Sequence, residues 1–230
     1  MLHRLSLHRA ALIGYPPTVE LYLAAGANVN GQTRAGRTPL YISVLMGHRK
    51  VSQLLICAGA STDIRDRVGW TPLHAAAWGG CRNTVRMLIE AGSEVDIRDH
   101  RGFTPLHRAV QRGSIRAVEL LCKAGARVNT RRDIDLTSPL HSSAERGYIG
   151  ISEALIRYGA LMNCRDYEDG TPLHYAAWRG HLDMVRSLLS YGANRDLKNH
   201  VGFTALHIAE CEGYWDVARA LADDGRPTRD

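Results

Sequence analysis

The sequence has five cysteines, and no two of them are close enough to form a metal-binding or disulfide motif. None lies within four residues of another; they are Cys57, Cys81, Cys122, Cys164 and Cys211. This spacing excludes a C-x-x-C zinc site and the even-numbered disulfide framework of small secreted domains. We therefore expect reduced thiols in a cytoplasmic protein, with the nucleus as a second compartment.

Long apolar runs and the common catalytic motifs are missing as well. No stretch approaches the length of a membrane span, and His8 and Arg9 interrupt the apolar run that a signal peptide needs. The sequence contains neither a glycine-rich phosphate loop nor a G-x-S-x-G elbow. We therefore expect a protein without enzymatic activity, cofactor, metal or membrane segment.

The composition is that of an ordinary folded chain with a moderate excess of positive charge. Of the 230 residues 45% are apolar, which is enough for a sizeable core, and the net charge at pH 7 is +6. This charge permits an acidic partner but does not by itself indicate nucleic acid.

One unit of about 33 residues is repeated seven times. Six tetrads step by 33, 33, 34, 33 and 33 residues, and Leu5-Ser6-Leu7-His8 is a degraded first copy. The clear tetrads begin at Thr38, Thr71, Thr104, Ser138, Thr171 and Thr204. Glycines keep the same register, nine residues after each tetrad start (Gly14, Gly47, Gly80, Gly113, Gly147, Gly180 and Gly213) and 21 residues after it (Gly26, Gly59, Gly92, Gly125, Gly159, Gly192 and Gly225).

Each position of the unit predicts a local structure. The hydroxyl oxygen of Thr or Ser caps a helix, and the proline that follows loses only an amide without a helical partner. The first glycine ends this helix in a left-handed conformation. Val85, Leu88 and Ile89 then show the spacing of a second amphipathic helix. A polar turn such as Asp99-His100-Arg101-Gly102 leads to the next copy.

The period and the T-P-L-H-x-A signature resemble the ankyrin repeat over nearly the whole chain. The resemblance implies an all-α solenoid of stacked helix-turn-helix units joined by β-hairpin-like finger loops. We expect one domain over residues 1–230. Its repeats are expected at about 1–33, 34–66, 67–99, 100–133, 134–166, 167–199 and 200–230.

Three places depart from the pattern. The fifth finger carries one extra residue within 130–137, and Leu136 replaces its usual glycine. In the sixth copy the glycine of Asp169-Gly170 is shifted by one position. The first copy has Leu2, Leu5, Leu12, Ile13 and Tyr15 where a polar cap is expected. We expect an irregular fifth finger, and the apolar first copy leaves self-association open for a chain otherwise expected to be monomeric.

The histidines and finger asparagines have structural explanations. The resemblance implies that the tetrad histidine forms hydrogen bonds between adjacent loops; here it recurs as His8, His74, His107, His141, His174 and His207. Because these residues lie on successive layers, they cannot converge on one metal. The family also suggests hydroxylation of Asn129 or Asn163, and a structural role for these asparagines is the alternative.

The resemblance implies that a partner contacts the finger tips and the ends of the first helices. These positions lie just before each tetrad and seven or eight residues after its start. Tryptophan and arginine, which dominate many binding interfaces, are concentrated there. The predicted partner-binding residues are Trp70, Trp78, Arg101, Phe103, Arg112, Arg146, Trp178, Arg179 and Phe203.

The arginines at these positions favour a protein partner with an extended acidic segment. Arg112, Arg146 and Arg179 share one repeat position, and their only evident acidic neighbour is Glu145. A second basic row contains Arg65, Arg98 and Arg165, each followed by an aspartate with which it can pair instead. The two tryptophans at the helix ends can also be explained as fillers between helices. Single-stranded RNA is the alternative ligand of a basic, aromatic face.

Overall fold

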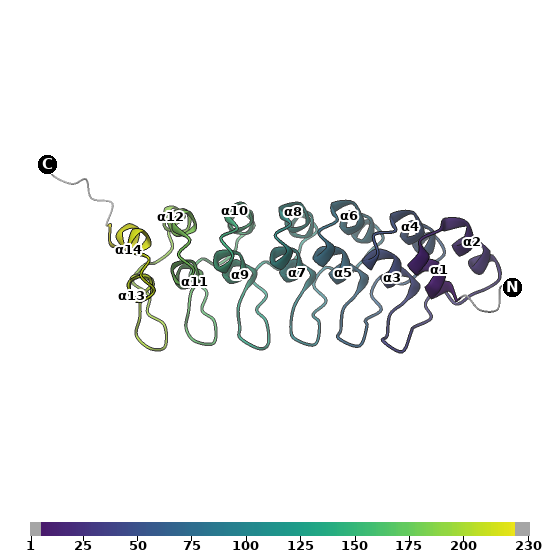
Figure 1. Cartoon of the computed structure of the whole chain (residues 1–230), viewed down its shortest axis with the longest axis horizontal. Coiled ribbons are helices and arrows are strands. Elements are labelled where there is room, and N and C mark those ends of the chain that lie inside the picture. The colour runs from purple at the N-terminus through teal and green to yellow at the C-terminus, as the bar shows by residue number, and fades with distance from the viewer. Residues whose placement is uncertain (1–5, 224–230) are drawn as a thin grey trace. The chain divides into compact units, whose positions relative to one another are not determined.

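The computed structural model describes residues 6–223, and every regular element in that range is an α-helix (Figure 1). This confirms the expected all-α class, with one helix pair in each expected repeat. Leu2, Leu5 and Gly225 lie outside the described residues. No helix within 6–223 combines the length and the apolar character needed to cross a membrane.

The chain divides into two compact units, Met1–Ala126 and Arg127–Asp230. The grouping of all seven repeats into one domain stays a prediction. The extra residue of the fifth finger lies in the second unit, shortly after the division.

The first unit contains four helix pairs. Each first helix packs against the first helix of the next repeat, α1 on α3, α3 on α5 and α5 on α7. Figure 1 shows the second helices above them and the fingers on the opposite side. The pairs are α1 (Leu7–Ile13) with α2 (Pro16–Ala24), α3 (Pro39–Leu45) with α4 (Arg49–Cys57), α5 (Pro72–Gly79) with α6 (Arg82–Glu90), and α7 (Pro105–Arg112) with α8 (Ile115–Lys123).

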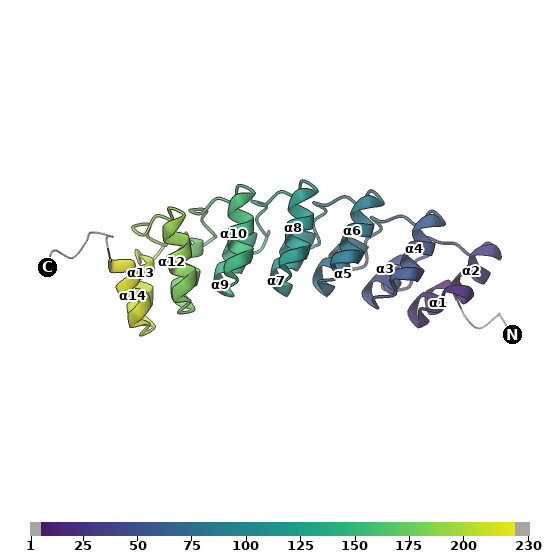
Figure 2. The same cartoon turned by 90° about the horizontal axis from the view of Figure 1, so that it is seen from above.

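The second unit contains three pairs with the same internal arrangement. Helix α9 packs on α11 and α11 on α13, while α10 packs on α12 and α12 on α14. Figure 2 shows the second helices of the unit lying alongside one another. The pairs are α9 (Pro139–Glu145) with α10 (Ile149–Arg157), α11 (Pro172–Trp178) with α12 (Leu182–Ser190), and α13 (Ala205–Cys211) with α14 (Trp215–Ala222).

The tetrad builds the start of the first helix as the sequence predicts. In α5 the Thr71 hydroxyl accepts a hydrogen bond from the backbone amide of His74, and the amide of Thr71 donates to His74 Nδ1 at 3.2 Å. The two residues therefore satisfy each other's polar groups at the N-terminus of the helix. The tetrad leucine of the same helix, Leu73, is fully buried in the stack.

The tetrad histidine also joins each helix to the next finger. His74 Nε2 donates to the carbonyl of Phe103 at 3.0 Å, and His141 and His174 do the same to the carbonyls of Gly170 and Phe203. Burial lowers the pKa of His74 and of His141 to about 4 and also lowers that of His174. These histidines are therefore neutral at physiological pH, and the expected loop-to-loop bond is confirmed for all three.

Within each unit, backbone hydrogen bonds close the individual fingers and also join neighbouring fingers to each other. Within the first unit the amide of Asp66 donates to the carbonyl of Trp70, and the amide of Arg67 donates to Ala35 of the previous finger. Within the second unit the corresponding bonds are Asp166 to Gly170 and Tyr167 to Asp135. The fingers therefore have the hydrogen bonding of short hairpins.

The fifth and sixth fingers, which precede Ser138 and Thr171, have no glycine at the left-handed position of their turns. In most fingers the residue before the end of the closed loop is a glycine with positive φ, but here Leu136 (φ 57°) and Asp169 (φ 58°) take that conformation. The fifth finger closes from Arg132 to Thr137, one residue longer than the others, so the tip absorbs the insertion. Gly170 is not the turn residue; it stands at the position of Trp70 and Phe103.

We predict that Leu136→Gly stabilises the second unit. A left-handed backbone costs a non-glycine residue about 1–2 kcal/mol, and the greater flexibility of glycine in the unfolded chain removes about 0.5–1 kcal/mol of the gain. Urea unfolding should therefore show a free energy of unfolding higher by roughly 0.5–1 kcal/mol.

Gly202→Ala is the matched control for this prediction. Gly202 has the same conformation (φ 84°), and an added Cβ would meet nothing within 4 Å. Its replacement should lower the free energy of unfolding by about 1 kcal/mol through backbone strain alone. Equal stabilities of wild type and Leu136→Gly, with Gly202→Ala destabilised, would contradict the strain at Leu136.

The neutral buried histidines make stability depend on pH. His74 and His141 stay neutral in the folded chain down to about pH 4, whereas their ordinary pKa is 6.5. The unfolded chain therefore binds more protons between these values. The free energy of unfolding is highest above pH 6.5 and falls toward pH 4, by about 1.4 kcal/mol per pH unit for each histidine.

Urea titrations from neutral pH to about pH 4.5 measure this slope. His141→Gln should reduce the slope by about 1.4 kcal/mol per pH unit. Val201→Ala, at an exposed finger residue that does not titrate, should leave it unchanged. An unchanged slope in His141→Gln would show that this histidine does not carry the pH dependence.

Candidate functional site

The first unit brings part of the predicted residues together on what we call the first-unit face, formed by Trp70, Trp78, Arg101 and Arg112. The rings of Trp70 and Trp78 lie 6.3 Å apart, and Trp78 keeps 45% of its surface exposed near the end of α5. Arg112 is the last residue of α7 and is exposed, as is Arg101. Trp78 is therefore not a filler between helices.

Beneath this face a guanidinium is held between two aromatic rings. Arg108 lies 4.7 Å from the ring centroid of Trp70 and 3.8 Å from that of Phe103, and it forms an ion pair with Asp99 at 2.5 Å. Burial alone would raise the pKa of Asp99, but hydrogen bonds from Arg108 and from backbone amides hold it below its usual value. Phe103 is only 4% exposed, so its ring supports the face from below.

The second unit carries the counterpart, the second-unit face, formed by Arg146, Trp178, Arg179 and Phe203. Trp178 ends α11, and it and Phe203 are each 41% exposed. The ring of Phe203 stacks on that of His207, with centroids 5.9 Å apart. The half-exposed tryptophan thus recurs at the same repeat position in both units.

Of the three arginines that share one repeat position, Arg179 already has contacts within the chain. Arg179 forms an ion pair with Glu145 at 2.8 Å and lies 3.8 Å from the ring centroid of Trp178. Glu145 is the one acidic neighbour that the sequence offers. Part of the attraction of Arg179 for an acidic ligand is therefore met inside the molecule.

Arg112 and Arg146 are left for a partner. Within residues 6–223 neither guanidinium has a hydrogen bond or an ion pair, and both are exposed at the C-terminal ends of first helices. A cation is favourable there because the last carbonyls of a helix carry partial negative charge. Both can therefore keep their position on the surface and still accept a carboxylate from a ligand.

The aspartates that follow the finger arginines, with which those arginines could alternatively pair, accept hydrogen bonds from backbone amides of their own finger. Asp66 Oδ1 accepts the amides of Val68 and Trp70, each at 3.0 Å. Asp99 and Asp166 accept the amides two and four residues on in the same way. These carboxylates hold the turn of the finger, and Arg165 pairs instead with Asp169 at 3.3 Å.

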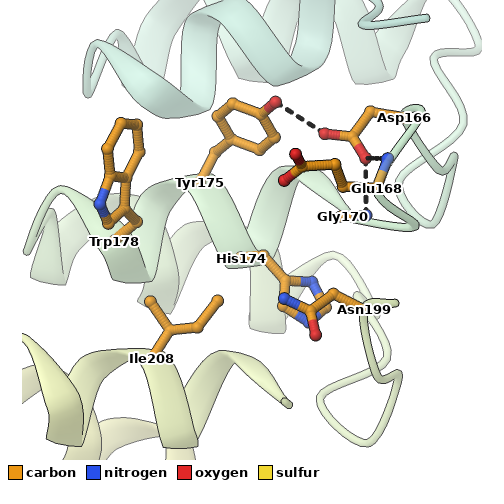
Figure 3. Close-up of a pocket in the computed structure, with 8 residues that line it drawn as sticks. All are labelled: Asp166, Glu168, Gly170, His174, Tyr175, Trp178, Asn199 and Ile208. Carbon is orange, nitrogen blue, oxygen red and sulfur yellow. Dashed lines mark hydrogen bonds between the residues drawn. The ribbon is translucent and has the colours of Figure 1, made fainter. Parts of the chain in front are cut away.

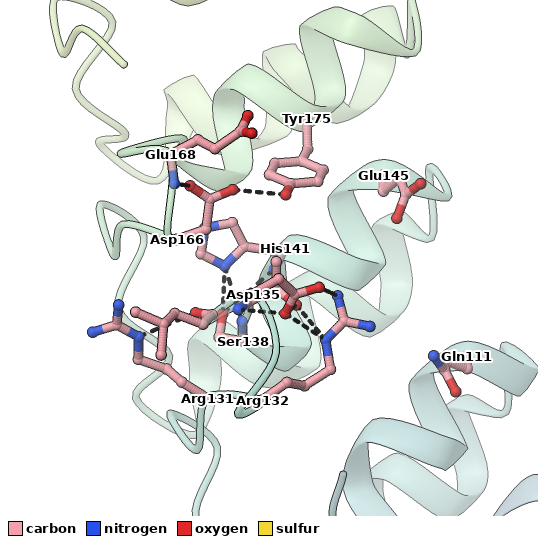
Figure 4. Close-up of polar contacts among 12 residues, drawn as sticks. Gln111, Arg131, Arg132, Asp135, Ser138, His141, Glu145, Asp166, Glu168 and Tyr175 are labelled. Carbon is pink, nitrogen blue, oxygen red and sulfur yellow. Dashed lines mark hydrogen bonds and ion pairs between the residues drawn. The ribbon is translucent and has the colours of Figure 1, made fainter. Parts of the chain in front are cut away.

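Acidic groups gather between the fifth and sixth fingers of the second unit (Figure 4). Asp135 accepts hydrogen bonds from Arg132 and from the backbone of Thr137, so it takes over the turn-holding role in the longer finger. The hydroxyl of Tyr175 donates to Asp166 at 2.7 Å. Burial and this carboxylate raise the pKa of Tyr175, and Asp135 and Glu145 act in the same direction.

Sequence reasoning missed Arg108, Tyr175 and the role of Gly170. Arg108 and Tyr175 both lie four residues after a tetrad start, where neighbouring repeats have small residues such as Ala75 and Ser142. Large polar side chains in that column were the available signal. Their contacts bridge neighbouring repeats, and the repeat pattern alone does not predict which rotamer they adopt.

The finger asparagines have the structural role that the sequence allowed. Asn129 donates to the carbonyl of Gly159 at 2.9 Å and accepts the amide of Leu161 at 2.9 Å. Asn163 accepts the amide of Asn194 at 2.9 Å. Each asparagine therefore ties one finger to the following one.

The residues that could hold a metal do not converge. No group of three or more His, Cys, Asp or Glu residues suited to a metal ion occurs in the part of the chain that the structure describes. All five cysteines are free, and Cys122 is buried, which raises the pKa of its thiol to about 11.

Comparison with known proteins gives one family. The family model for ankyrin repeats (three copies) matches residues 7–99, 92–166 and 140–229. Among solved structures, the ankyrin repeat domain of Bcl-3, a member of the IκB family, is similar at 30% sequence identity with a TM-score of 0.82. The match covers 93% of this chain and 97% of that one. No curated protein matches in sequence.

These matches bear on the fold class as well. They cover nearly the whole chain, and they agree with the capping boxes, the fingers and the paired helices seen in each unit. The fold class predicted from the tetrads, an all-α ankyrin-repeat solenoid, is therefore confirmed. The chain belongs to the ankyrin-repeat family.

Proposed function

We propose that this ankyrin-repeat protein is a non-catalytic scaffold or adaptor that binds another protein through its first-unit face and its second-unit face, each of which can hold an extended segment of the partner. The half-exposed tryptophan pair, Trp78 and Trp178, carries the proposal. Tryptophan is usually well buried, and exposed aromatic rings beside arginine are typical of binding hot spots. Each ring lies at the end of a first helix, on a rigid element.

The charges around these rings define the partner more closely. Arg112 and Arg146 have no partner within residues 6–223, and a carboxylate of the ligand could form two parallel hydrogen bonds with either guanidinium. Since Arg179 is engaged by Glu145, one acidic group per face fits better than a continuous acidic run. The proposed ligand is a segment with isolated acidic residues and apolar residues that cover the tryptophans.

The decisive variants are Trp178→Ala and Arg146→Glu. Affinity purification with mass spectrometry identifies the partner, and calorimetry with the purified partner gives the affinity. Each variant should weaken binding about tenfold or more, since losing a hot-spot side chain costs at least about 1.4 kcal/mol. Thermal unfolding should stay close to wild type, because both side chains are exposed.

Two variants serve as matched controls for this prediction. Trp215→Ala removes an exposed tryptophan from the second helix α14, and Arg186→Glu reverses an exposed charge on α12. Both should leave the affinity unchanged. Wild-type binding by Trp178→Ala and Arg146→Glu would overturn the proposed face. So would tight binding of single-stranded RNA that weakens steeply with salt, which is the mark of phosphate contacts.

Self-association is a second candidate function, favoured by one observation. Leu12, Ile13, Tyr15 and Leu21 are all exposed on or between α1 and α2. Neighbouring apolar side chains on a surface often mark a protein contact. A second copy of this repeat could cover them.

Gel filtration with light scattering tests this candidate. The wild type should show a mass that rises with concentration, and a Leu12→Glu/Leu21→Glu double variant should remain a monomer. Val201→Glu, at an exposed apolar residue of the last described finger, should behave as wild type. A wild type that stays monomeric at high concentration would rule out self-association.

A further inference from the structure

A cavity of about 320 Å³ opens in the second unit beside Trp178 (Figure 3). Tyr175 and Trp178 of α11 form its aromatic side, and Asn199 and Ile208 of the next repeat lie opposite. Gly170 belongs to its lining. At the same repeat position Trp70, Phe103 and Phe203 have aromatic rings.

The cavity is the space that an aromatic ring fills in the first unit. There Trp70 lies with its ring centroid 6.3 Å from that of His74, nearly parallel at 23°, and donates from its indole nitrogen to Asp99 at 3.1 Å. The counterparts of His74 and Trp78 in the cavity are His174 and Trp178. Because Gly170 stands where the first unit has Trp70, the indole ring is missing, while the counterparts of the residues around that ring are still present.

The cavity carries negative charge. Asp166 is buried and accepts hydrogen bonds from the amides of Glu168 and Gly170 and from the hydroxyl of Tyr175, at 2.7 to 2.8 Å. The carboxylate of Glu168 forms no hydrogen bond or ion pair within the described range, and Figure 3 shows it directed toward the space beside Tyr175. His174 adds no positive charge at neutral pH, because burial lowers its pKa.

The first unit also shows which cation fits such surroundings. Arg108 lies between the rings of Trp70 and Phe103 and pairs with Asp99. At the matching positions the seventh repeat has Ile208 and Asn199, so the carboxylates beside the cavity come instead from Asp166 and Glu168. Arg179 stacks on Trp178 but does not line the cavity. The cavity, which is lined by aromatic rings and carboxylates, is therefore lined by no arginine of this chain.

We propose that the cavity binds the side chain of an arginine on the partner segment. Its guanidinium would stack on the aromatic side formed by Tyr175 and Trp178 and pair with Glu168. A planar group suits the space better than the compact ammonium of lysine, since a tryptophan ring occupies the equivalent space in the first unit. This inference rests on the proposed function, because the arginine belongs to the segment held on the second-unit face.

Blocked amino acids test the cavity without knowledge of the partner. The indole N–H signal of Trp178, assigned by its loss in Trp178→Ala, is followed by NMR in the full chain while N-acetyl-arginine methylamide is added. Binding should be saturable, with a Kd on the order of 1 mM. The citrulline analogue, which has nearly the same shape but no charge, should bind about tenfold more weakly, because it loses both the ion pair and the cation–π contact.

Two variants report on the two features of the cavity. Glu168→Gln should weaken arginine binding by up to about fivefold, because the carboxylate that it removes is exposed. Gly170→Phe introduces a ring of the kind found at Phe103 and Phe203 and should abolish binding. Because the new Cβ would lie 3.0 Å from Asp166 Oδ2, thermal unfolding of this variant is measured alongside to show that it folds. Glu153→Gln, on the second helix α10, is the matched control and should bind arginine as wild type does.

The outcomes separate this proposal from the proposed function. Equal binding of the arginine and citrulline compounds, tighter binding of blocked tyrosine or lysine, or no saturable binding would each overturn the arginine site. If the partner is lost in Trp178→Ala but retained by Glu168→Gln and Gly170→Phe, the face stands and the arginine site fails. If blocked arginine binds while Trp178→Ala and Arg146→Glu retain the partner, the cavity stands and the proposed face fails.

Discussion

The hydrogen bond from a buried tetrad histidine to the next finger is the contact on which the rest of the structure depends. His74 closes the N-terminus of its own helix with Thr71 and at the same time reaches the carbonyl of Phe103 in the following repeat. One neutral side chain thus sets the helix start, the finger position and the spacing of two layers. Because the framework relies on these few positions, the columns beside them are free to vary with the ligand.

Most of the framework could be predicted from the sequence because its causes are local. A threonine cap, a proline at the first helical position and a glycine with positive φ act within a few residues. The exposed positions of Trp78 and Trp178 followed from the same register. The ion pairs of Arg179 with Glu145 and of Arg108 with Asp99 did not, because each depends on how long side chains are arranged between or along packed repeats.

Gly170 shows how a local interpretation of the sequence can miss a cavity. The sequence Asp169-Gly170 reads as a turn glycine displaced by one position, yet Asp169 adopts the left-handed conformation itself, which aspartate tolerates better than most residues. Gly170 is consequently an aromatic position left without a side chain. The finding required the backbone angles and the comparison with Trp70, and no property of the glycine alone would have indicated it.

The positive net charge of the chain favours an acidic ligand, whereas the carboxylates of the cavity favour a basic one. Which of these acts on a given ligand group depends on its distance from the charged side chains. The excess of +6 is a sum over the whole chain, and interactions between exposed charges are largely screened beyond about 8–10 Å at physiological salt. A ligand group next to Tyr175 therefore responds mainly to Asp166 and Glu168, whereas one next to Arg146 responds to that guanidinium. A partner segment that fits both proposed contacts carries charges of both signs, which distinguishes it from a uniformly acidic peptide and from a nucleic acid strand.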